Sequence, residues 1–281
     1  MSNPIADPLV EMTDTDADSD LVRMESTPAG AVTITLNRPA RRNAFDAELI
    51  AAMAQAFETV GSAEGVRVVF LRGEGGMFSA GADLDWMRAA ADRSESDNRD
   101  DAFEMARMLK ALWDIPALTV ALVEGGAFGG GAGVAAACDL AVATAGARFS
   151  FSEVRLGLIP ATISPYVIRA IGSRASRGLF ATGRVFDADH ALRIGLITEV
   201  AADAGALAAA KDRIAAEIMA CAPGAVADSK RLVDDVAGKP IDRGLMEETA
   251  RRIARARVGE EGQDGVRAFL ERRKPAWASV D

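Results

Sequence analysis

Six of the nine residues from position 125 to position 133 are glycine, and this segment constrains the fold more than any other. It lies between an apolar run, Ala117 to Val123, and an alanine-rich run, Val134 to Cys138. The first run predicts a buried strand and the second a buried helix. Ordering so many glycines costs conformational entropy, and the usual return is backbone that approaches another group closely.

Strands and helices alternate along the first 200 residues. Val32, Ile34 and Leu36 alternate with polar residues, which predicts a half-buried strand, and Asp46 is placed to cap a helix that runs to about Val60. Such alternation implies an α/β fold with parallel strands and crossover helices. Further strands are expected at 66–71, 118–123 and 140–144, a turn at 73–76, a loop or weak helix start at 92–101, and a helix that ends at Trp113.

Three regions are therefore predicted. Residues 1–20 hold six acidic side chains and no lysine or arginine, so they are interpreted as a flexible acidic tail rather than a targeting signal. Residues 21–200 form the α/β core with the active site. Residues 201–281 form a helical C-terminal region, because they are rich in Ala, Arg and Glu and show no strand pattern.

Composition excludes several function classes. A net charge of −9 argues against nucleic acid as a partner. Cys138 and Cys221 are the only cysteines, which favours a reducing cytoplasm, and His190 is the only histidine, which excludes histidine-rich metal sites. The apolar region from Ile115 to Cys138 is interrupted by Glu124 and the glycines, so no membrane span is expected.

Three interpretations of the glycine segment compete. Gly131 to Ala136 fits a dinucleotide-binding pattern, but Asp139 and Glu153 are interpreted as too close to it to be the ribose-binding acid, which is expected about 20 residues on. The glycines can also be purely structural and permit close packing. The third interpretation is an oxyanion hole, in which backbone N–H groups at a helix start stabilise a developing negative charge.

An oxyanion hole needs a second donor, and a second candidate turn is present. Phe78 to Leu84 also lies between a buried strand and a helix, and it contains Gly81. Two consecutive strand-turn-helix units can direct their N–H groups into one pocket. Five motifs then appear in order: Asn37-Arg-Pro39, Arg42-Asn-Ala-Phe45, Phe78-Ser-Ala-Gly-Ala-Asp-Leu84, Phe128-Gly-Gly-Gly131 and Phe151-Ser-Glu-Val-Arg-Leu-Gly-Leu-Ile-Pro160.

These motifs resemble the crotonase (enoyl-CoA hydratase/isomerase) superfamily, from about Val22 to Pro275. The resemblance implies a spiral of ββα units with a C-terminal helical trimerisation region, a homotrimer or dimer of trimers, and an acyl-CoA substrate with no further cofactor or metal. It implies that the N–H groups of Ala82 and Gly130 hold the thioester oxygen, and that Glu153 is the acid or base.

The resemblance also implies the groups that contact the substrate. Asp83 is expected to cap or brace the helix that follows it, and Asp139 and His190 are expected to be structural. The two arginines considered for a carboxylated acyl group are Arg155 and Arg169. The residues implied for substrate or CoA binding are Arg42, Ala44, Ala80, Asp83, Leu84, Phe128, Pro160, Phe269 and Lys274.

One position departs from the pattern. The hydratases of this family use two glutamates, and the first falls at Gly133, which has no side chain. The segment from Leu158 to Tyr166 is similar to that of bacterial methylglutaconyl-CoA hydratases, which act on branched, carboxylated enoyl-CoAs. The sequence therefore predicts hydration of a 2-enoyl-CoA, with a Δ3-Δ2 enoyl-CoA isomerase and a non-catalytic acyl-CoA-binding protein as alternatives.

Overall fold

The computed structural model describes residues 20–278, so most of the tail predicted at 1–20 lies outside the described residues. A six-stranded sheet forms the centre of the molecule, with strand order β1-β2-β3-β4-β6-β9. β1 pairs antiparallel with β2, and the other pairs are parallel. The strands are β1 (Val22–Ser26), β2 (Ala31–Leu36), β3 (Val68–Gly73), β4 (Leu118–Val123), β6 (Leu140–Thr144) and β9 (Glu199–Ala201).

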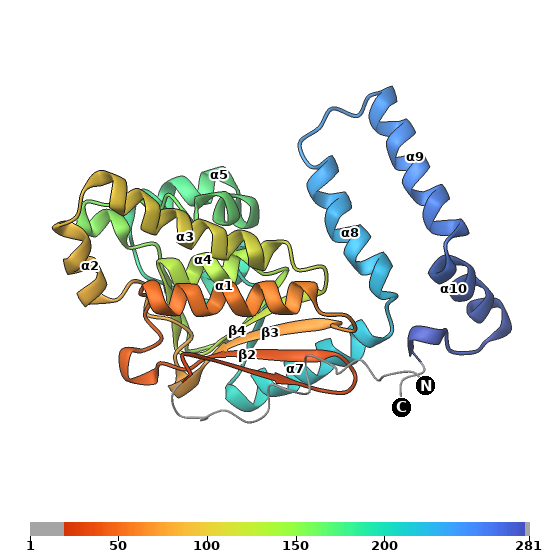
Figure 1. Ribbon diagram of the computed structural model, residues 1–281, viewed down its shortest axis with the longest axis horizontal. Helices are drawn as coiled ribbons and strands as arrows, with labels where there is room; N and C mark the ends of the chain where they lie inside the picture. Colours follow the sequence, from red (N-terminus) through yellow and green to blue (C-terminus); the bar gives the residue numbers. More distant parts are fainter. Residues whose placement is uncertain (1–19, 279–281) are drawn as a thin grey trace, which may run out of the picture.

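Helices cover both faces of this sheet (Figure 1). Because side chains alternate along a strand, Val69 and Leu71 of β3 face the larger core, while Val68 and Phe70 face the smaller one. The larger core contains apolar residues of α1 (Ala47–Ser62), α3 (Glu95–Trp113), α4 (Gly130–Ala137) and α5 (Ser164–Thr182). The smaller core contains residues of α7 (Ala204–Met219), so the first helix of the predicted C-terminal region packs on the sheet.

Local sequence signals set several boundaries as expected. The Asp46 side chain accepts a hydrogen bond from Leu49 N and caps α1. This helix buries Leu49, Ile50, Met53 and Phe57. The segment at 92–101 is mainly helical, because α3 begins at Glu95 after the Ser94 side chain caps it. The short elements that connect these are η1 (Pro39–Arg41), η2 (Glu74–Gly76), α2 (Leu84–Ala91), η3 (Glu153–Leu156) and α6 (Ala188–Ile194).

A second, smaller sheet was not predicted. It has the order β5-β7-β8, formed by β5 (Gly126–Phe128), β7 (Arg148–Ser150) and β8 (Phe186–Asp187). Strands of two or three residues are too short to show an alternation of apolar and polar residues. This sheet positions the site, because β5 runs into the glycine turn and β7 ends just before Glu153.

The last three long helices lie apart from the body in Figure 1. We call α8 (Pro223–Val236), α9 (Arg243–Val258) and α10 (Glu260–Glu271) the C-terminal arm; η4 (Ala276–Ala278) follows it. The Arg67 guanidinium donates to Cys221 O at 2.6 Å, before the arm, and to Trp277 O at 3.2 Å, after it. Arg67 directly precedes β3, so both ends of the arm are held near the start of this strand.

Candidate active site

The first glycine turn connects η2 to α2 and is held by buried polar groups. The Ser79 hydroxyl donates to Asn43 O at 2.8 Å and accepts from Gly81 N at 3.2 Å. Phe45 N donates to Gly81 O, and Asp83 N donates to Phe45 O. The backbone of Phe45 therefore forms hydrogen bonds with the residues on either side of Ala82. Among residues 20–278 no acceptor lies within hydrogen-bond distance of the Ala82 N–H.

The second glycine turn lies directly against the first. Ser79 N donates to Gly126 O at 3.2 Å, and Phe128 N donates to Ser79 O at 3.0 Å. A Cβ atom on Gly81, which has φ +92°, would lie only 2.9 Å from Phe128 O. The two turns therefore converge, as two donors for one pocket require.

Gly129 starts the helix after the second turn. Its φ of +48° and ψ of −117° are accessible only to glycine, and it provides no side-chain cap for α4. The first N–H groups of a helix have no partner inside the helix, and they carry partial positive charge. Within the described part of the chain the Gly130 N–H has no acceptor, so it is available to a bound group.

Glu153 lies beside this helix start. β7 pairs in parallel with β5, and Gly129 N donates to Ser150 O at 2.9 Å, which brings the end of β7 to the second turn. Glu153 follows as the first residue of η3, and a Cβ on Gly129 would lie 3.2 Å from its Oε1. The carboxylate that sequence predicts as the acid or base is thus adjacent to one of the two predicted donors.

The Glu153 side chain is partly buried. Its Oε2 atom is buried, and it has no hydrogen-bond partner among the described residues. This burial raises the pKa of Glu153, and only the hydrogen bond from its own backbone N–H acts in the opposite direction. A carboxyl group with a raised pKa beside free N–H donors is suited to proton transfer near neutral pH.

Ile163 fills the space over Gly133, where two-carboxylate members of the resembled family have a glutamate. A Cβ on Gly133 would lie 2.6 Å from Ile163 Cβ and closer still to Ile163 Cγ2. Ile163 is 2% exposed and precedes α5. Ile163 was not predicted from the sequence, because no local pattern indicates that this residue packs against α4.

Asp83 acts as a helix cap. Its carboxylate accepts from Asp85 N at 2.8 Å and Trp86 N at 3.3 Å at the start of α2, and it pairs with Arg38 at 3.6 Å and Arg41 at 3.8 Å. Burial opposes its ionisation, but the two backbone donors and the two arginines outweigh burial and lower its pKa. The capping role expected for Asp83 is therefore present in the structure.

The other residues predicted to contact substrate near the turns surround the first turn or flank Glu153. Ala80 N donates to Arg42 O at 3.0 Å, and Ala44 follows in the same buried segment. Leu84, the first residue of α2, is 63% exposed. Phe128 ends β5 and Pro160 is buried between η3 and α5, so both lie on elements that border Glu153.

Two predicted CoA-binding residues lie elsewhere in the chain. Phe269, on α10, is 82% exposed, and Lys274, after α10, is also exposed. Figure 1 places α10 at the opposite side of the molecule from α2. One copy of the chain therefore does not bring Phe269 or Lys274 to the glycine turns.

The remaining charged candidates differ in their surroundings. Arg155 is exposed in η3, two residues after Glu153 and near Gly183, and Arg169 lies over the Trp113 ring at 5.8 Å. Asp139 accepts from Lys230 Nζ of the arm at 2.7 Å, which is a structural role as expected. His190 lies between Arg184 and Arg193, and burial and these two cations lower its pKa.

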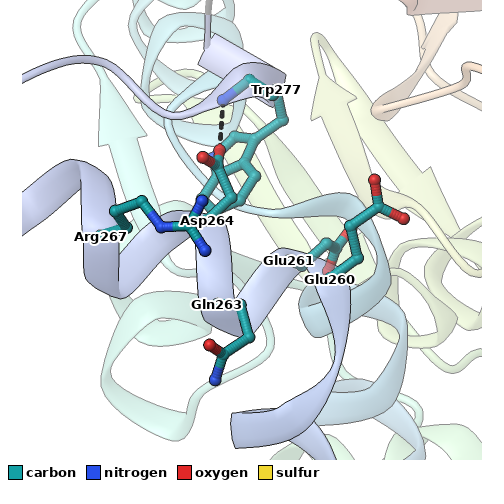
Figure 2. Close-up of a pocket in the computed structure, with 7 residues that line it drawn as sticks. Glu260, Glu261, Gln263, Asp264, Arg267 and Trp277 are labelled. Atoms are coloured by element: carbon teal, nitrogen blue, oxygen red, sulfur yellow. Dashed lines mark hydrogen bonds between the residues drawn. The ribbon is translucent and has the colours of Figure 1, made fainter.

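A cavity of about 470 Å³ lies on the arm rather than at the turns (Figure 2). Two of the acidic residues that line it have partners: Asp264 accepts from Ala276 N, and Glu261 accepts from Gly224 N and Ala225 N. The cavity therefore lies where the chain end is fastened to α10. Its lining residues are Glu260, Glu261, Gln263, Asp264, Arg267, Ala276 and Trp277.

A known protein family matches nearly the whole chain. The family profile described as Enoyl-CoA hydratase/isomerase matches residues 26–280. The chain belongs to the enoyl-CoA hydratase/isomerase family. The crotonase-type α/β fold predicted from the five motifs is therefore confirmed, and the chain is a member of a family of enzymes.

Several members of the enoyl-CoA hydratase/isomerase family are similar over nearly their whole length. An enoyl-CoA hydratase from Shewanella pealeana is 39% identical, with a TM-score of 0.89 over 97% of this chain and 100% of its own. AtuE from Pseudomonas aeruginosa is 36% identical, with a TM-score of 0.88 over 92% of this chain and 100% of its own. The enoyl-CoA hydratase EchA19 from Mycobacterium tuberculosis is 33% identical over 246 residues, 86% of this chain and 91% of its own.

Within residues 20–278, no helix is both long enough and apolar enough to span a membrane. The two cysteines are free; Cys138 is buried and Cys221 is exposed.

Proposed function

We propose that this protein adds water across the 2,3 double bond of a 2-enoyl-CoA. The thioester oxygen accepts hydrogen bonds from Ala82 N–H and Gly130 N–H, and Glu153 transfers the proton. One observation carries this proposal: the Glu153 carboxyl lies against Gly129, at the point where two turns with free N–H groups converge. No cofactor is required beyond the CoA of the substrate.

A single carboxylate balances the reaction if it acts twice. As base, Glu153 takes one proton from water while the water oxygen bonds to C3. The electron pair of the double bond moves to C2 and the thioester oxygen, where the two N–H groups stabilise the enolate. Each such donor contributes on the order of 3 kcal/mol to the transition state. Glu153 then returns its proton to C2, which completes the addition of one water molecule.

The substrate class follows from the charges around the site. An acyl group with its own carboxylate, as in 3-methylglutaconyl-CoA, needs a cation to offset its desolvation. Arg155 is exposed, Arg169 lies over the Trp113 ring, and neither forms an ion pair with Glu153, so we expect a carboxylated substrate to depend on a cation from another part of the assembly. We therefore rank short and branched uncharged enoyl-CoAs first and 3-methylglutaconyl-CoA second.

CoA binding in this proposal involves two copies of the chain. Arg42 is beside the first turn, whereas Phe269 and Lys274 are on or after α10, far from the turns of their own chain. A homotrimer or dimer of trimers allows the arm of one copy to reach the site of another, and it also covers exposed apolar side chains of the arm. In this proposal the assembly works in a reducing cytoplasm, where Cys138 and Cys221 stay free. The exposed apolar residues are Val233, Ile241, Met246, Ile253, Val258, Val266, Phe269 and Leu270.

The geometry over Gly133 favours a second candidate. A Δ3-Δ2 enoyl-CoA isomerase needs only one carboxylate, which takes a proton from C2 and returns it to C4 as the double bond shifts. Gly133 offers no second acid, and Ile163 occupies the space that such an acid would need.

The test is an assay of purified protein on a panel of 2-enoyl-CoAs and 3-enoyl-CoAs. Hydration removes the absorbance of the conjugated thioester and adds the mass of water, whereas isomerisation creates that absorbance at constant mass. We expect hydration of a short or branched 2-enoyl-CoA. Isomerisation alone would establish the second candidate, and no turnover of any member of the panel would overturn the proposal.

A further inference from the structure

Glu153 and Ile163 pack against successive turns of one helix. Glu153 Oε1 is the atom nearest to where a Cβ on Gly129 would lie, and an Ile163 atom is nearest to where a Cβ on Gly133 would lie. Gly133 N donates to Gly129 O at 3.0 Å, so the two glycines are one helical turn apart. Gly129 is the N-cap of α4, so this hydrogen bond places the carboxyl and the isoleucine at the same end of the helix.

The isoleucine is held rigidly in this place. Its side chain is 2% exposed, and its carbonyl accepts from Val167 N at 3.1 Å at the start of α5. Phe151, which is fully buried, belongs to the same core cluster. The side chain therefore cannot swing away to admit water or a larger group at position 133.

We propose that Ile163 is the positioning residue that makes Glu153 act alone. Its side chain excludes any side chain at position 133 and forms a dry wall beside the carboxyl, so that one glutamate in an apolar setting does all the proton transfer. This inference rests on the proposed function, and it identifies the residue that sets the ionisation of its catalytic group.

The ionisation of Glu153 depends on its burial and not on a neighbouring charged side chain. Its burial and its own backbone N–H are the influences that shift its ionisation, and no described lysine or arginine makes an ion pair with it. Buried Oε2 also has no partner among residues 20–278. Hydration of the pocket is therefore the variable that a change at Ile163 controls.

The first experiment compares the pH profile of kcat/KM for the wild type and Ile163→Ala. The shorter side chain admits water, which favours the ionised carboxylate. We expect the acid limb to move about one pH unit lower, which is a fraction of the shift of about 3–5 pH units that full burial of a carboxyl can cause. Ile163→Val keeps the branched Cβ and the wild-type limb. Ile171→Ala, on α5 and 8% exposed, is the matched control that lowers stability without moving the limb.

The second experiment installs the excluded acid. With Ile163→Gly, the nearest remaining atom of residue 163 is Cα, 3.7 Å from a Cβ at position 133, so a Cβ there no longer clashes with residue 163, and Gly133→Glu can then be tested. We expect the double variant to hydrate a 2-enoyl-CoA about tenfold faster than Ile163→Gly alone, at the low end of what a general acid contributes, to allow for imperfect placement. Gly133→Glu alone is expected to lower the melting temperature sharply.

The outcomes separate two kinds of failure. An unchanged acid limb in folded Ile163→Ala, with wild-type turnover intact, overturns the role of Ile163 but not the proposed function. If Ile163→Ala does not fold, Ile163→Thr places a hydroxyl in the same volume, and an unmoved limb there is equally decisive. If the wild type turns over no enoyl-CoA, the proposed function fails, and thermal unfolding then tests the packing: it is overturned if Gly133→Ala destabilises the Ile163→Gly variant, which lacks the Cβ at residue 163, as much as it destabilises the wild type.

Discussion

The two strand-to-helix turns of the site lie against each other, yet they end in different ways. At the first turn, the Asp83 carboxylate caps α2 and takes the N–H groups of Asp85 and Trp86. At the second, Gly129 has no side chain, and α4 begins without a side-chain cap. The first turn carries its own anion, whereas the second leaves its partial positive charge for a group from outside. The contrast indicates that the first turn, which offers the Ala82 N–H, is braced by a carboxylate of the chain itself, whereas the helix start at the second turn stays uncapped for a bound group.

The largest expected effect is on the acid beside the second turn. Glu153→Gln keeps the shape of the side chain but removes proton transfer, so kcat is expected to fall on the order of a thousandfold, within the range of general acid–base catalysis. Isothermal titration with a CoA thioester is expected to show nearly unchanged binding. The matched control is Glu124→Gln, at the acid that precedes the same glycine segment, which keeps most of its activity. Equal activity of the two variants would contradict the account.

A backbone change at the second turn sharpens the comparison. Gly129→Ala forces a side chain into φ +48° and to 3.2 Å from Glu153 Oε1. We expect kcat to fall on the order of a hundredfold, as when one oxyanion donor is lost. Gly178→Ala is the control, because this helical glycine has ordinary φ and open space around its Cα, and alanine there is expected to be neutral or slightly stabilising. Wild-type kcat in Gly129→Ala would show that the second turn binds nothing.

The first turn is expected to respond mainly in stability. Asp83→Ala removes a helix cap and the ion pairs to Arg38 and Arg41, which keep Asp46 and Asp85 as partners, so the free energy of unfolding is expected to fall by about 1–2 kcal/mol. Asp203→Ala is the control, because Asp203 caps α7 without such arginines. Since the pKa of Asp83 is lowered in the fold, its stabilisation is present above its unfolded pKa and is lost as pH falls toward the folded value. Urea unfolding at pH 7 and near pH 3 measures both effects; an equal loss at both pH values would contradict the ionic part.

The smallest expected effect has the opposite sign. The pKa of Glu153 is raised in the fold, so the folded state binds more protons and its stability falls as pH rises through that pKa. Glu153→Gln removes this penalty, and its melting temperature at pH 7 is expected to equal or exceed that of the wild type. The difference is expected to vanish near pH 4. A variant less stable than the wild type at pH 7 would show that the carboxylate stabilises the fold.

The sequence predicted most of the parts of this site that depend on local pattern. A few neighbouring residues suffice to predict the strand at β2, the Asp46 cap and both glycine turns. The five motifs then connected these features to a family. A local signal for α3 also existed, because Ser94 and Asp97 form a helix start within the segment interpreted as loop or weak helix.

The parts that were missed depend on contacts between distant residues. The small sheet of β5, β7 and β8 consists of strands too short for alternation to be read. Ile163 meets Gly133 only after the chain has left α4, formed β6 and β7 and passed Glu153. The absence of a side chain at Gly133 was visible in the sequence, but the residue that fills the space was visible only in the fold.

The most direct test of the account is a crystal structure of Glu153→Gln with a bound 2-enoyl-CoA. The account predicts the thioester oxygen within hydrogen-bond distance, about 2.7–3.1 Å, of both the Ala82 and Gly130 nitrogens, with residue 153 facing C2 and C3. A thioester bound away from both turns, or held by only one of them, would contradict it.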